Sequence, residues 1–239
     1  MPEPHLDKIP TFVKGLDEKM DGGMVPGSIV LVAGKAGSMK STLAFTIAFN
    51  LARTRKAYTF YLSFEQRKES ILEQMGKLGI DSKLTPTMTV LDIKSFRKIW
   101  SDDEGKQENW LQMVLKGLGE FKHVKGGLDL LVIDSLDALF SVSEVEADHR
   151  THFFNFMEGL RDLGLTVLII TEMKEGDQSY SQYWFDTFLV DGIIHMELER
   201  AGKTVNLQIG IPKMRKCRHT RSYFPLIFDE SGFRVVAKE

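Results

Sequence analysis

Apolar and polar positions alternate along the chain in two different periods. Short, nearly continuous apolar runs occur at 29–33, 58–63, 88–93, 128–134 and 165–171. Apolar residues three and four positions apart mark the segments 41–55, 67–78, 107–121 and 148–163. Continuous apolar runs are typical of strands buried on both faces, and the longer period is typical of helices that pack on a sheet. The alternation predicts an α/β fold whose central sheet is mostly parallel and flanked by helices.

The two ends of the chain depart from this alternation. Residues 1–28 hold several glycines and prolines, which predicts an irregular approach segment with one short helix over 13–20. From Phe188 onward the pattern becomes that of β-hairpins, and it pairs 193–199 with 204–214 and 223–228 with 233–236. The sequence has no linker-like run and no internal repeat. We expect residues 1–239 to form a single domain that ends in antiparallel β-hairpins.

The composition is that of a globular protein, with 27% charged and 43% apolar residues among 239. The formal net charge of -2 gives no global attraction to nucleic acid or to an anionic membrane. The single cysteine, Cys217, excludes an intramolecular disulfide framework and a multi-cysteine metal site, which fits a reducing compartment. The apolar runs are too short to span a bilayer, and the N-terminus lacks a signal-like region. These features predict a cytoplasmic protein without a membrane partner.

A loop of small residues joins the first predicted strand to the first predicted helix. The phosphate-binding pattern is G-x-x-x-x-G-K-[ST], and Gly34, Lys40 and Ser41 fall on its first, seventh and eighth positions. In such a loop, backbone N–H groups and a helix N-terminus bind anions, the lysine reaches the outer phosphates, and the hydroxyl suits Mg2+. Met39 replaces the second glycine, where a positive φ costs a side chain roughly 1–2 kcal/mol. The alternative is a turn that binds nothing.

Carboxylates follow other predicted strands. The fourth apolar run ends in Asp134, and a buried central strand of this kind can deliver one carboxylate to the C-terminal edge of a sheet. There Asp134 can lie beside Ser41 and hold the water shell of a metal ion, although an aspartate that only caps the next turn is the alternative. Glu65 follows the second run, and Thr171 and Glu172 end the fifth. The sequence thus predicts a nucleotide site at one edge of the sheet.

Several separated motifs occur in an order that resembles the KaiC-like branch of the RecA superfamily of ATPases, from about Ile9 to Val236. Besides the phosphate loop and Glu65, the motifs are Gly15-Leu-Asp17, Gly22-Gly-Met-Val-Pro-Gly27, Val132-Ile-Asp-Ser-Leu136, Asp191-Gly192 and Lys213-Met-Arg215. The resemblance implies a RecA-like P-loop NTPase core that binds ATP with Mg2+. It also implies a homo-oligomer, either a ring such as a hexamer or a filament, with ATP between neighbouring subunits.

The resemblance also implies roles for individual residues. Ser41 and Asp134 correspond to the Mg2+ positions, and Glu65 corresponds to the base that orients or deprotonates the attacking water. Lys213 and Arg215 correspond to a motif that reaches the γ-phosphate of the adjacent subunit, where such fingers contribute about 10³–10⁵ in rate. A solvated basic hairpin edge is their alternative role. The residues implied in holding the nucleotide are Gly34, Lys35, Ala36, Gly37, Ser38, Met39, Lys40, Ser41, Thr42 and His219.

Two departures from the family pattern bear on catalysis. Gln66 stands in place of the second of two paired glutamates, which removes one negative charge but leaves Glu65 as the base. Met39 replaces the glycine before Lys40, which predicts slow turnover or binding without turnover. We expect a Mg2+-dependent ATPase that couples nucleotide state to oligomerisation or to an unidentified protein partner. The alternative is a regulator that binds nucleotide without hydrolysing it.

A recombinase-like DNA-binding ATPase is the remaining alternative. Relatives of the family hold DNA with loops after the fourth and fifth strands, which correspond here to 141–149 and 173–186. The first segment is acidic, and the second has Lys174 as its only basic residue. Because phosphate contacts dominate DNA affinity, the composition argues against nucleic acid as a partner.

Overall fold

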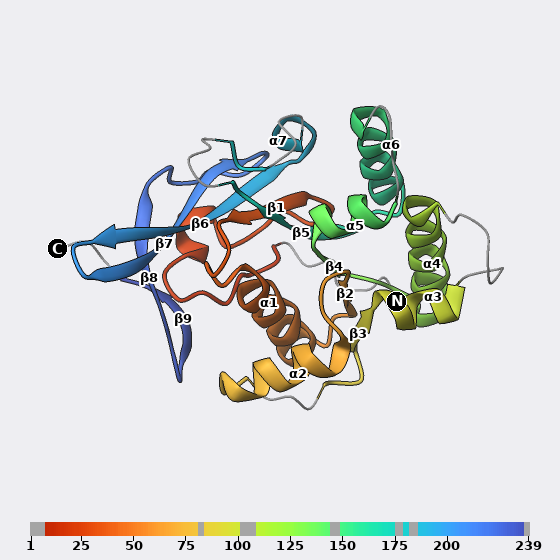
Figure 1. Cartoon of the computed structure of the whole chain (residues 1–239), viewed down its shortest axis with the longest axis horizontal. Coiled ribbons are helices and arrows are strands. Elements are labelled where there is room, and N and C mark those ends of the chain that lie inside the picture. Colours follow the sequence, from red (N-terminus) through yellow and green to blue (C-terminus); the bar gives the residue numbers. More distant parts are fainter. Residues whose placement is uncertain are drawn as a thin grey trace.

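One continuous sheet runs through the part of the chain that the structure describes (Figure 1). The computed structural model describes residues 8–80, 84–100, 109–143, 149–174, 179–181 and 186–236. The strands are β1 (Ile29–Gly34), β2 (Thr59–Ser63), β3 (Met88–Asp92), β4 (Leu130–Asp134), β5 (Thr166–Glu172), β6 (Gly192–Ala201), β7 (Thr204–Met214), β8 (Tyr223–Asp229) and β9 (Gly232–Val235). The helices are η1 (Asp17–Met20), α1 (Lys40–Arg55), α2 (Lys68–Lys77), α3 (Ile93–Trp100), α4 (Trp110–Lys125), α5 (Leu136–Val142), α6 (His149–Asp162) and α7 (Asp186–Leu189).

The first five strands form the predicted parallel core, in the order β3-β2-β4-β5-β1. Every residue of β1, β2 and β4 is buried, as their continuous apolar runs require. The register pairs Gly34 with Glu172 and Ser63 with Asp134. The carboxyl ends of β1, β5, β2 and β4 therefore meet at one edge of the sheet, where ligands of open α/β sheets bind.

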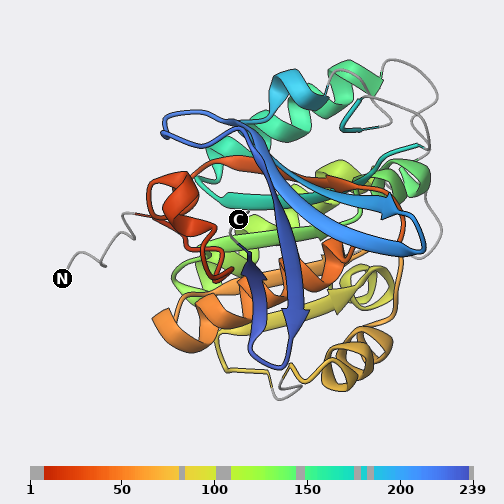
Figure 2. The ribbon, with the colours of Figure 1, turned by 90° about the vertical axis from the view of Figure 1, so that its left-hand side faces the viewer.

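The C-terminal part of the sheet turns antiparallel, which confirms the predicted hairpins. β6 lies parallel to β1 on its far side from β5, and β7, β8 and β9 then follow in antiparallel order. Figure 2 looks at the molecule from the side of these C-terminal strands, with η1 beside them. Lys14 exchanges backbone hydrogen bonds with Phe233 and Val235 of β9, so the N-terminal approach segment is attached to the last hairpin.

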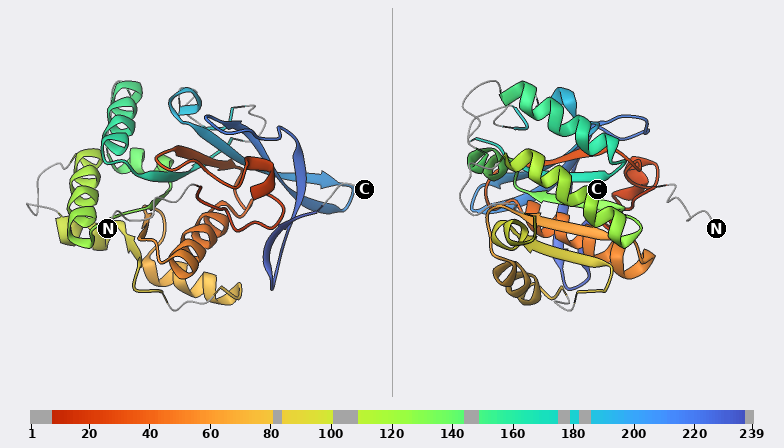
Figure 3. Two further views of the ribbon diagram at one scale, coloured as in Figure 1. Left: turned by 180° about the vertical axis from the view of Figure 1, so that it is seen from behind. Right: turned by 90° about the vertical axis from the view of Figure 1, so that its right-hand side faces the viewer.

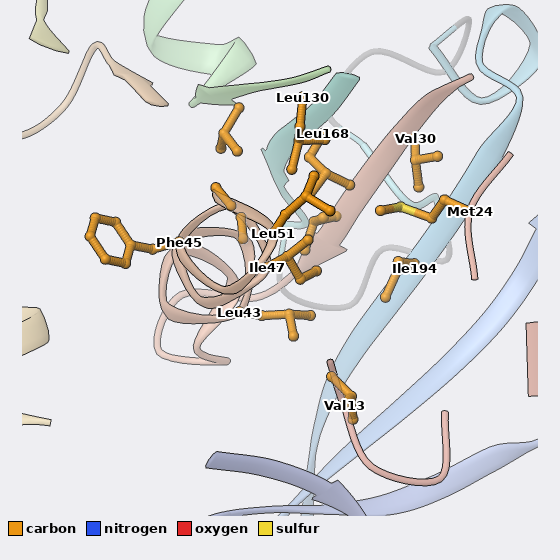
Figure 4. Packing of buried hydrophobic residues seen from close by; sticks show 14 of the residues in the cluster. Val13, Met24, Val30, Leu43, Phe45, Ile47, Leu51, Leu130, Leu168 and Ile194 are labelled. Atoms are coloured by element: carbon orange, nitrogen blue, oxygen red, sulfur yellow. The ribbon is translucent and has the colours of Figure 1, made fainter. Parts of the chain in front are cut away.

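Helices cover both faces of the parallel core. One face packs on α1, whose Leu43, Ile47 and Leu51 point toward the sheet (Figure 4). The opposite face packs on α3, α4 and α6, the last two being seen in the right-hand view of Figure 3. Alternate strand residues divide between the two layers, as a pleated strand requires, with Tyr61 on the α1 face and Phe60 on the other.

Some predicted elements differ from those observed. The run 88–93 ends one residue early because Asp92 accepts a hydrogen bond from the backbone N–H of Ser95 and begins α3, a helix that the sequence did not predict. α5 and α7 were also missed, being 7 and 4 residues long. The predicted helix over 13–20 is reduced to the single turn η1, because Gly15 adopts a φ of 84°, which a helix passing through it does not allow.

Two further sequence predictions concern binding to DNA and to a membrane. The segments considered as DNA-binding loops, 141–149 and 173–186, lie partly outside the described residues, with Gln178, Tyr183 and Trp184 among those omitted. Along the described residues, no helix combines the length and the hydropathy needed to cross a bilayer.

Candidate functional site

The phosphate-binding pattern occupies the loop between β1 and α1, at the edge where the parallel strands end. Gly34 is the last residue of β1, and a Cβ there would lie 2.3 Å from the carbonyl oxygen of Met196 and 2.6 Å from Oγ of Ser38. Only glycine fits such a contact without moving backbone. Ser38 is buried and donates from Oγ to the carbonyl of Lys35 at 2.8 Å, which closes the loop on itself. Packing therefore requires glycine at the first position of the pattern.

Met39 adopts the left-handed conformation that the pattern predicts for this position, with φ 64° and ψ 24°. Its carbonyl accepts a hydrogen bond from the backbone N–H of Leu43 at 2.9 Å, which begins α1. The side chain is half-buried and packs against the core on the α1 face. The expected geometry of the loop is thus present, although a methionine occupies the glycine position.

The strain at Met39 can be measured by comparing two substitutions that remove the same contacts. We expect Met39→Gly to be more stable than Met39→Ala by about 1 kcal/mol, because alanine keeps the cost of the left-handed conformation and glycine does not. Urea unfolding of the two variants gives this difference directly. Equal unfolding free energies would show that the loop changes conformation when the methionine is removed.

Lys40 is buried in the loop, with 7% of its surface exposed. Its ammonium donates a hydrogen bond to the carbonyl of Lys35 at 2.9 Å. Burial lowers the pKa of Lys40, and the carboxylates of Glu172, Asp134 and Glu65 act in the opposite direction. The loop thus places a buried ammonium beside the N-terminus of α1, and this combination can bind the outer phosphates of a nucleotide.

Asp134 and Ser41 lie together, as the sequence predicted. Asp134 is buried at the end of β4 and shares a side-chain hydrogen bond with Ser41 of the first turn of α1. The hydroxyl of Tyr61, a residue of β2, donates a hydrogen bond to Oδ2 of Asp134. Burial raises the pKa of Asp134 to about 6, while the hydrogen bond from Tyr61 lowers it and the charge of Glu65 raises it.

Glu65 stands beside Asp134 in the loop after β2. The backbone N–H of Phe64 donates to the carbonyl of Asp134 at 2.6 Å, which carries the β2 loop past the end of β4. The exposed carboxylate of Glu65 accepts a hydrogen bond from Ser135, the N-cap of α5. Gln66 is exposed, and its backbone N–H donates to Oγ of Ser63 at 3.0 Å. The loop thus holds Glu65 at the rim of the cradle with a free path to solvent.

Asp137 and Tyr61 are site residues that the sequence did not reveal. Oδ2 of Asp137 accepts from the backbone N–H of Glu172 at 2.9 Å and from Oγ1 of Thr171 at 3.4 Å. Burial raises the pKa of Asp137. The hydrogen bonds of Asp137 connect the first turn of α5 to the end of β5. Its position three residues after Asp134 was the available signal. Tyr61 could have been found because a buried tyrosine hydroxyl requires a partner.

Lys213, Arg215 and His219 lie away from the phosphate loop of the same chain. Met214 pairs with Gly192, and Gly192 pairs with Val30 near the start of β1, whereas the loop follows its end. Lys213 donates from Nζ to the carbonyls of Thr187 and Val190, both at 2.7 Å, and burial lowers its pKa.

The other two members of this segment also bond locally. Arg215 ion-pairs with Asp191 at 3.5 Å and donates to the carbonyl of Phe188 at 3.2 Å. Nδ1 of His219 lies 3.2 Å from the carbonyl of Cys217. Four residues of β1, a span of about 13 Å, separate the level of Met214 from the phosphate loop, and the described partners of these side chains lie outside that loop.

The residues at the cradle fit a nucleotide and its Mg2+. The loop ends at the N-terminus of α1, whose first backbone N–H groups and dipole provide an anion site. Ser41 and Asp134 provide a hydroxyl and a carboxylate oxygen already held together, which are the hard ligands that Mg2+ prefers. When bound, the metal would neutralise charge on the phosphates.

Comparisons with known proteins agree with this geometry. A family model described as the KaiC ATPase matches residues 9–239. The circadian clock protein KaiC2 of Synechocystis is 23% identical over 231 residues, which cover 97% of this chain and 40% of that protein. The circadian clock oscillator protein KaiC of Rippkaea orientalis is 25% identical over 231 residues, which cover 95% of this chain and 44% of that protein.

A solved structure shares the fold over its whole length. The crystal structure of a KaiC-like protein from the hyperthermophilic archaeon Pyrococcus horikoshii superposes with a TM-score of 0.80 and 22% identity, covering 96% of this chain and 98% of that one. The clock proteins differ in extent, since this chain spans less than half of their length. The family model covers nearly all of the chain, and the fold is the RecA-like core with C-terminal antiparallel hairpins. The chain therefore belongs to the KaiC family of ATPases.

Proposed function

We propose that this protein hydrolyses ATP in a Mg2+-dependent reaction at an interface between subunits, and that it couples the state of the nucleotide to oligomerisation or to a protein partner. The observation that carries the proposal is the convergence of Lys40, Ser41, Asp134 and Glu65 at one edge of the sheet. We also propose that the chain forms a single domain, a proposal supported by the continuous sheet.

Each residue of the cradle has a distinct part in the proposed reaction. Lys40 and the loop N–H groups bind the β- and γ-phosphates, and Ser41 with Asp134 holds Mg2+. Glu65 accepts the proton of the water that attacks the γ-phosphorus, as the bond to the β–γ bridging oxygen breaks and ADP leaves. The hydrogen bond from Ser135 fixes the direction of the Glu65 carboxylate.

A groove beside α1 suits the nucleoside of the substrate. It has a volume of 210 Å³ and is lined by Thr46, Phe49 and Asn50 of α1, by 78–80 after α2, and by the turn 228–232 between β8 and β9. Thr46 is six residues beyond Lys40, a rise of about 9 Å along the helix. A nucleotide whose phosphates occupy the cradle can therefore place its base in this groove.

Lys213 and Arg215 are proposed to act on the nucleotide of the neighbouring subunit. The proposal is supported by their position near the N-terminal end of β1, whereas the phosphate loop of the same chain follows the C-terminal end. Arg215 is half-exposed and can exchange its ion pair with Asp191 for a phosphate. Lys213 is held by two carbonyls and orients the same segment.

We expect Arg215→Ala to bind ATP normally and to lose on the order of 10³-fold in the rate of phosphate release, because a finger acting in trans stabilises the transition state and not the bound substrate. Phosphate release with Mg-ATP, measured alongside sizing of the wild type and the variant, tests this. Arg218→Ala is the matched control, since Arg218 is an exposed arginine in the same segment.

Mixing two inactive variants separates action in trans from action in cis. Arg215→Ala retains Lys40, and Lys40→Ala retains Arg215, so a mixed oligomer contains interfaces with both residues. Recovered phosphate release in the mixture supports the interface. An active monomer, or a mixture as inactive as its components, contradicts it. Binding of ATP with oligomerisation but no phosphate release by the wild type would favour the regulator that does not hydrolyse.

A further inference from the structure

Tyr61 is a fully buried tyrosine beneath the nucleotide cradle, on the α1 face of β2. Its ring packs edge-on against Phe45 of α1, with the ring centroids 5.5 Å apart. Phe45 lies one helical turn beyond Ser41, so both residues project from the same side of α1. This packing directs the far end of the tyrosine toward the first turn of the helix.

The hydroxyl of Tyr61 contacts both residues assigned to Mg2+. It donates to Oδ2 of Asp134 and shares a side-chain hydrogen bond with Ser41. The strand register explains the first contact, because Tyr61 pairs with Val132 and Asp134 is two residues further along the same face of β4. Because Tyr61 is fully buried and its partner is a carboxylate oxygen, its hydroxyl is the donor of this pair.

A phenylalanine would fill the same apolar space between α1 and β2. The hydroxyl therefore serves the polar pair above the ring, and Asp134, which is 4% exposed, depends on buried donors for its hydrogen bonds. A second layer of hydrogen bonds of this kind orients metal ligands, and removing one member costs roughly 10–100-fold in metal affinity.

We propose that Tyr61 is a positioning residue for Mg2+. Its hydroxyl bonds to Oδ2 of Asp134 and orients Ser41. The other carboxylate oxygen of Asp134 and the serine hydroxyl are then directed toward the metal. The proposal rests on the proposed binding of Mg-ATP. It assigns Tyr61 no contact with nucleotide or with the reacting atoms.

The test compares Tyr61→Phe with the wild type in the affinity for a fluorescent N-methylanthraniloyl derivative of ATP, with excess Mg2+ and with EDTA. We expect the affinity in EDTA to stay within about 2-fold, because the cradle is untouched. The gain in affinity that Mg2+ provides should fall on the order of 10-fold. Binding of Mn2+ to the nucleotide complex, followed by electron paramagnetic resonance, should weaken by a similar factor.

Two controls distinguish a positioning role from a structural one. Tyr58→Phe makes the same chemical change three residues earlier, on the opposite side of the chain, and should leave the Mg2+ gain unchanged. In an Asp134→Asn background, Tyr61→Phe should have little further effect, since the proposed action runs through Asp134. Thermal unfolding without nucleotide identifies a variant that merely fails to fold.

The outcomes separate this inference from the proposed function. Equal Mg2+ gains in Tyr61→Phe and the wild type, or additive effects in the double variant, would overturn the role of Tyr61 while leaving the ATP site in place. A wild type that binds the fluorescent nucleotide under neither condition would instead remove the proposed function itself.

Discussion

Replacing Lys40 by alanine should abolish ATP binding, with a loss of affinity on the order of 100-fold or more. The ammonium is buried, and its described partner is the carbonyl of Lys35 within its own loop. Each hydrogen bond from a buried cation to a phosphate contributes about 1.5–3 kcal/mol, and Lys40 is placed to reach two phosphate groups. The measurement is calorimetric titration with ATP and Mg2+.

Stability measurements show whether the loss of binding is specific to the charge. Burial lowers the pKa of Lys40, which means that the folded protein holds the charged form at a cost. Lys40→Met keeps much of the buried stem without the charge, so it should unfold at a temperature no lower than that of the wild type without nucleotide. It should lose ATP as completely as the alanine variant does. A methionine variant that still binds ATP would refute the assignment of the loop.

Replacing Glu65 by glutamine should preserve ATP binding and reduce phosphate release by at least about 10²-fold, the usual contribution of a general base. The amide oxygen of glutamine can still accept the hydrogen bond from Ser135, so the loop should keep its shape. The lost property is the ability to take a proton from water. Single-turnover phosphate release, with ATP affinity measured in parallel, separates these two effects.

Gln66→Ala serves as the control for Glu65→Gln, because it changes the adjacent exposed side chain without touching a carboxylate. We expect it to change phosphate release by less than about 3-fold, well below the effect expected of a base. If Glu65→Gln and the wild type release phosphate at the same rate, Glu65 is not the base, and Glu172 at the end of β5 becomes the residue to test.

The sequence predicted those parts of the molecule that depend on local pattern. Continuous apolar runs identified the parallel strands, and the spacing of Gly34, Lys40 and Ser41 located the cradle. The positive φ of Met39 followed from the motif and is confirmed. These features are fixed by neighbours in sequence, so the spacing of residue types along the chain was sufficient to locate them.

Contacts between distant segments could not be predicted in the same way. Asp137 gains its role from the backbone N–H of Glu172 in β5, 35 residues away. Tyr61 meets Asp134 across 73 residues, and no spacing along the chain encodes that meeting. The start of α3 was missed because Asp92 both ends a strand and caps a helix, and the apolar pattern alone does not separate these two functions.

The position of β1 has a consequence for an assembled ring. The phosphate loop follows one end of this strand, and β6 and β7 place Lys213 and Arg215 near the other end. Four residue steps of β1, from Val30 to Gly34, separate these two contact points by about 13 Å along the strand. In the proposed assembly the sheet of each subunit connects two nucleotides. The phosphate loop of the subunit binds one of them, and its Arg215 contacts the one bound by the neighbouring subunit.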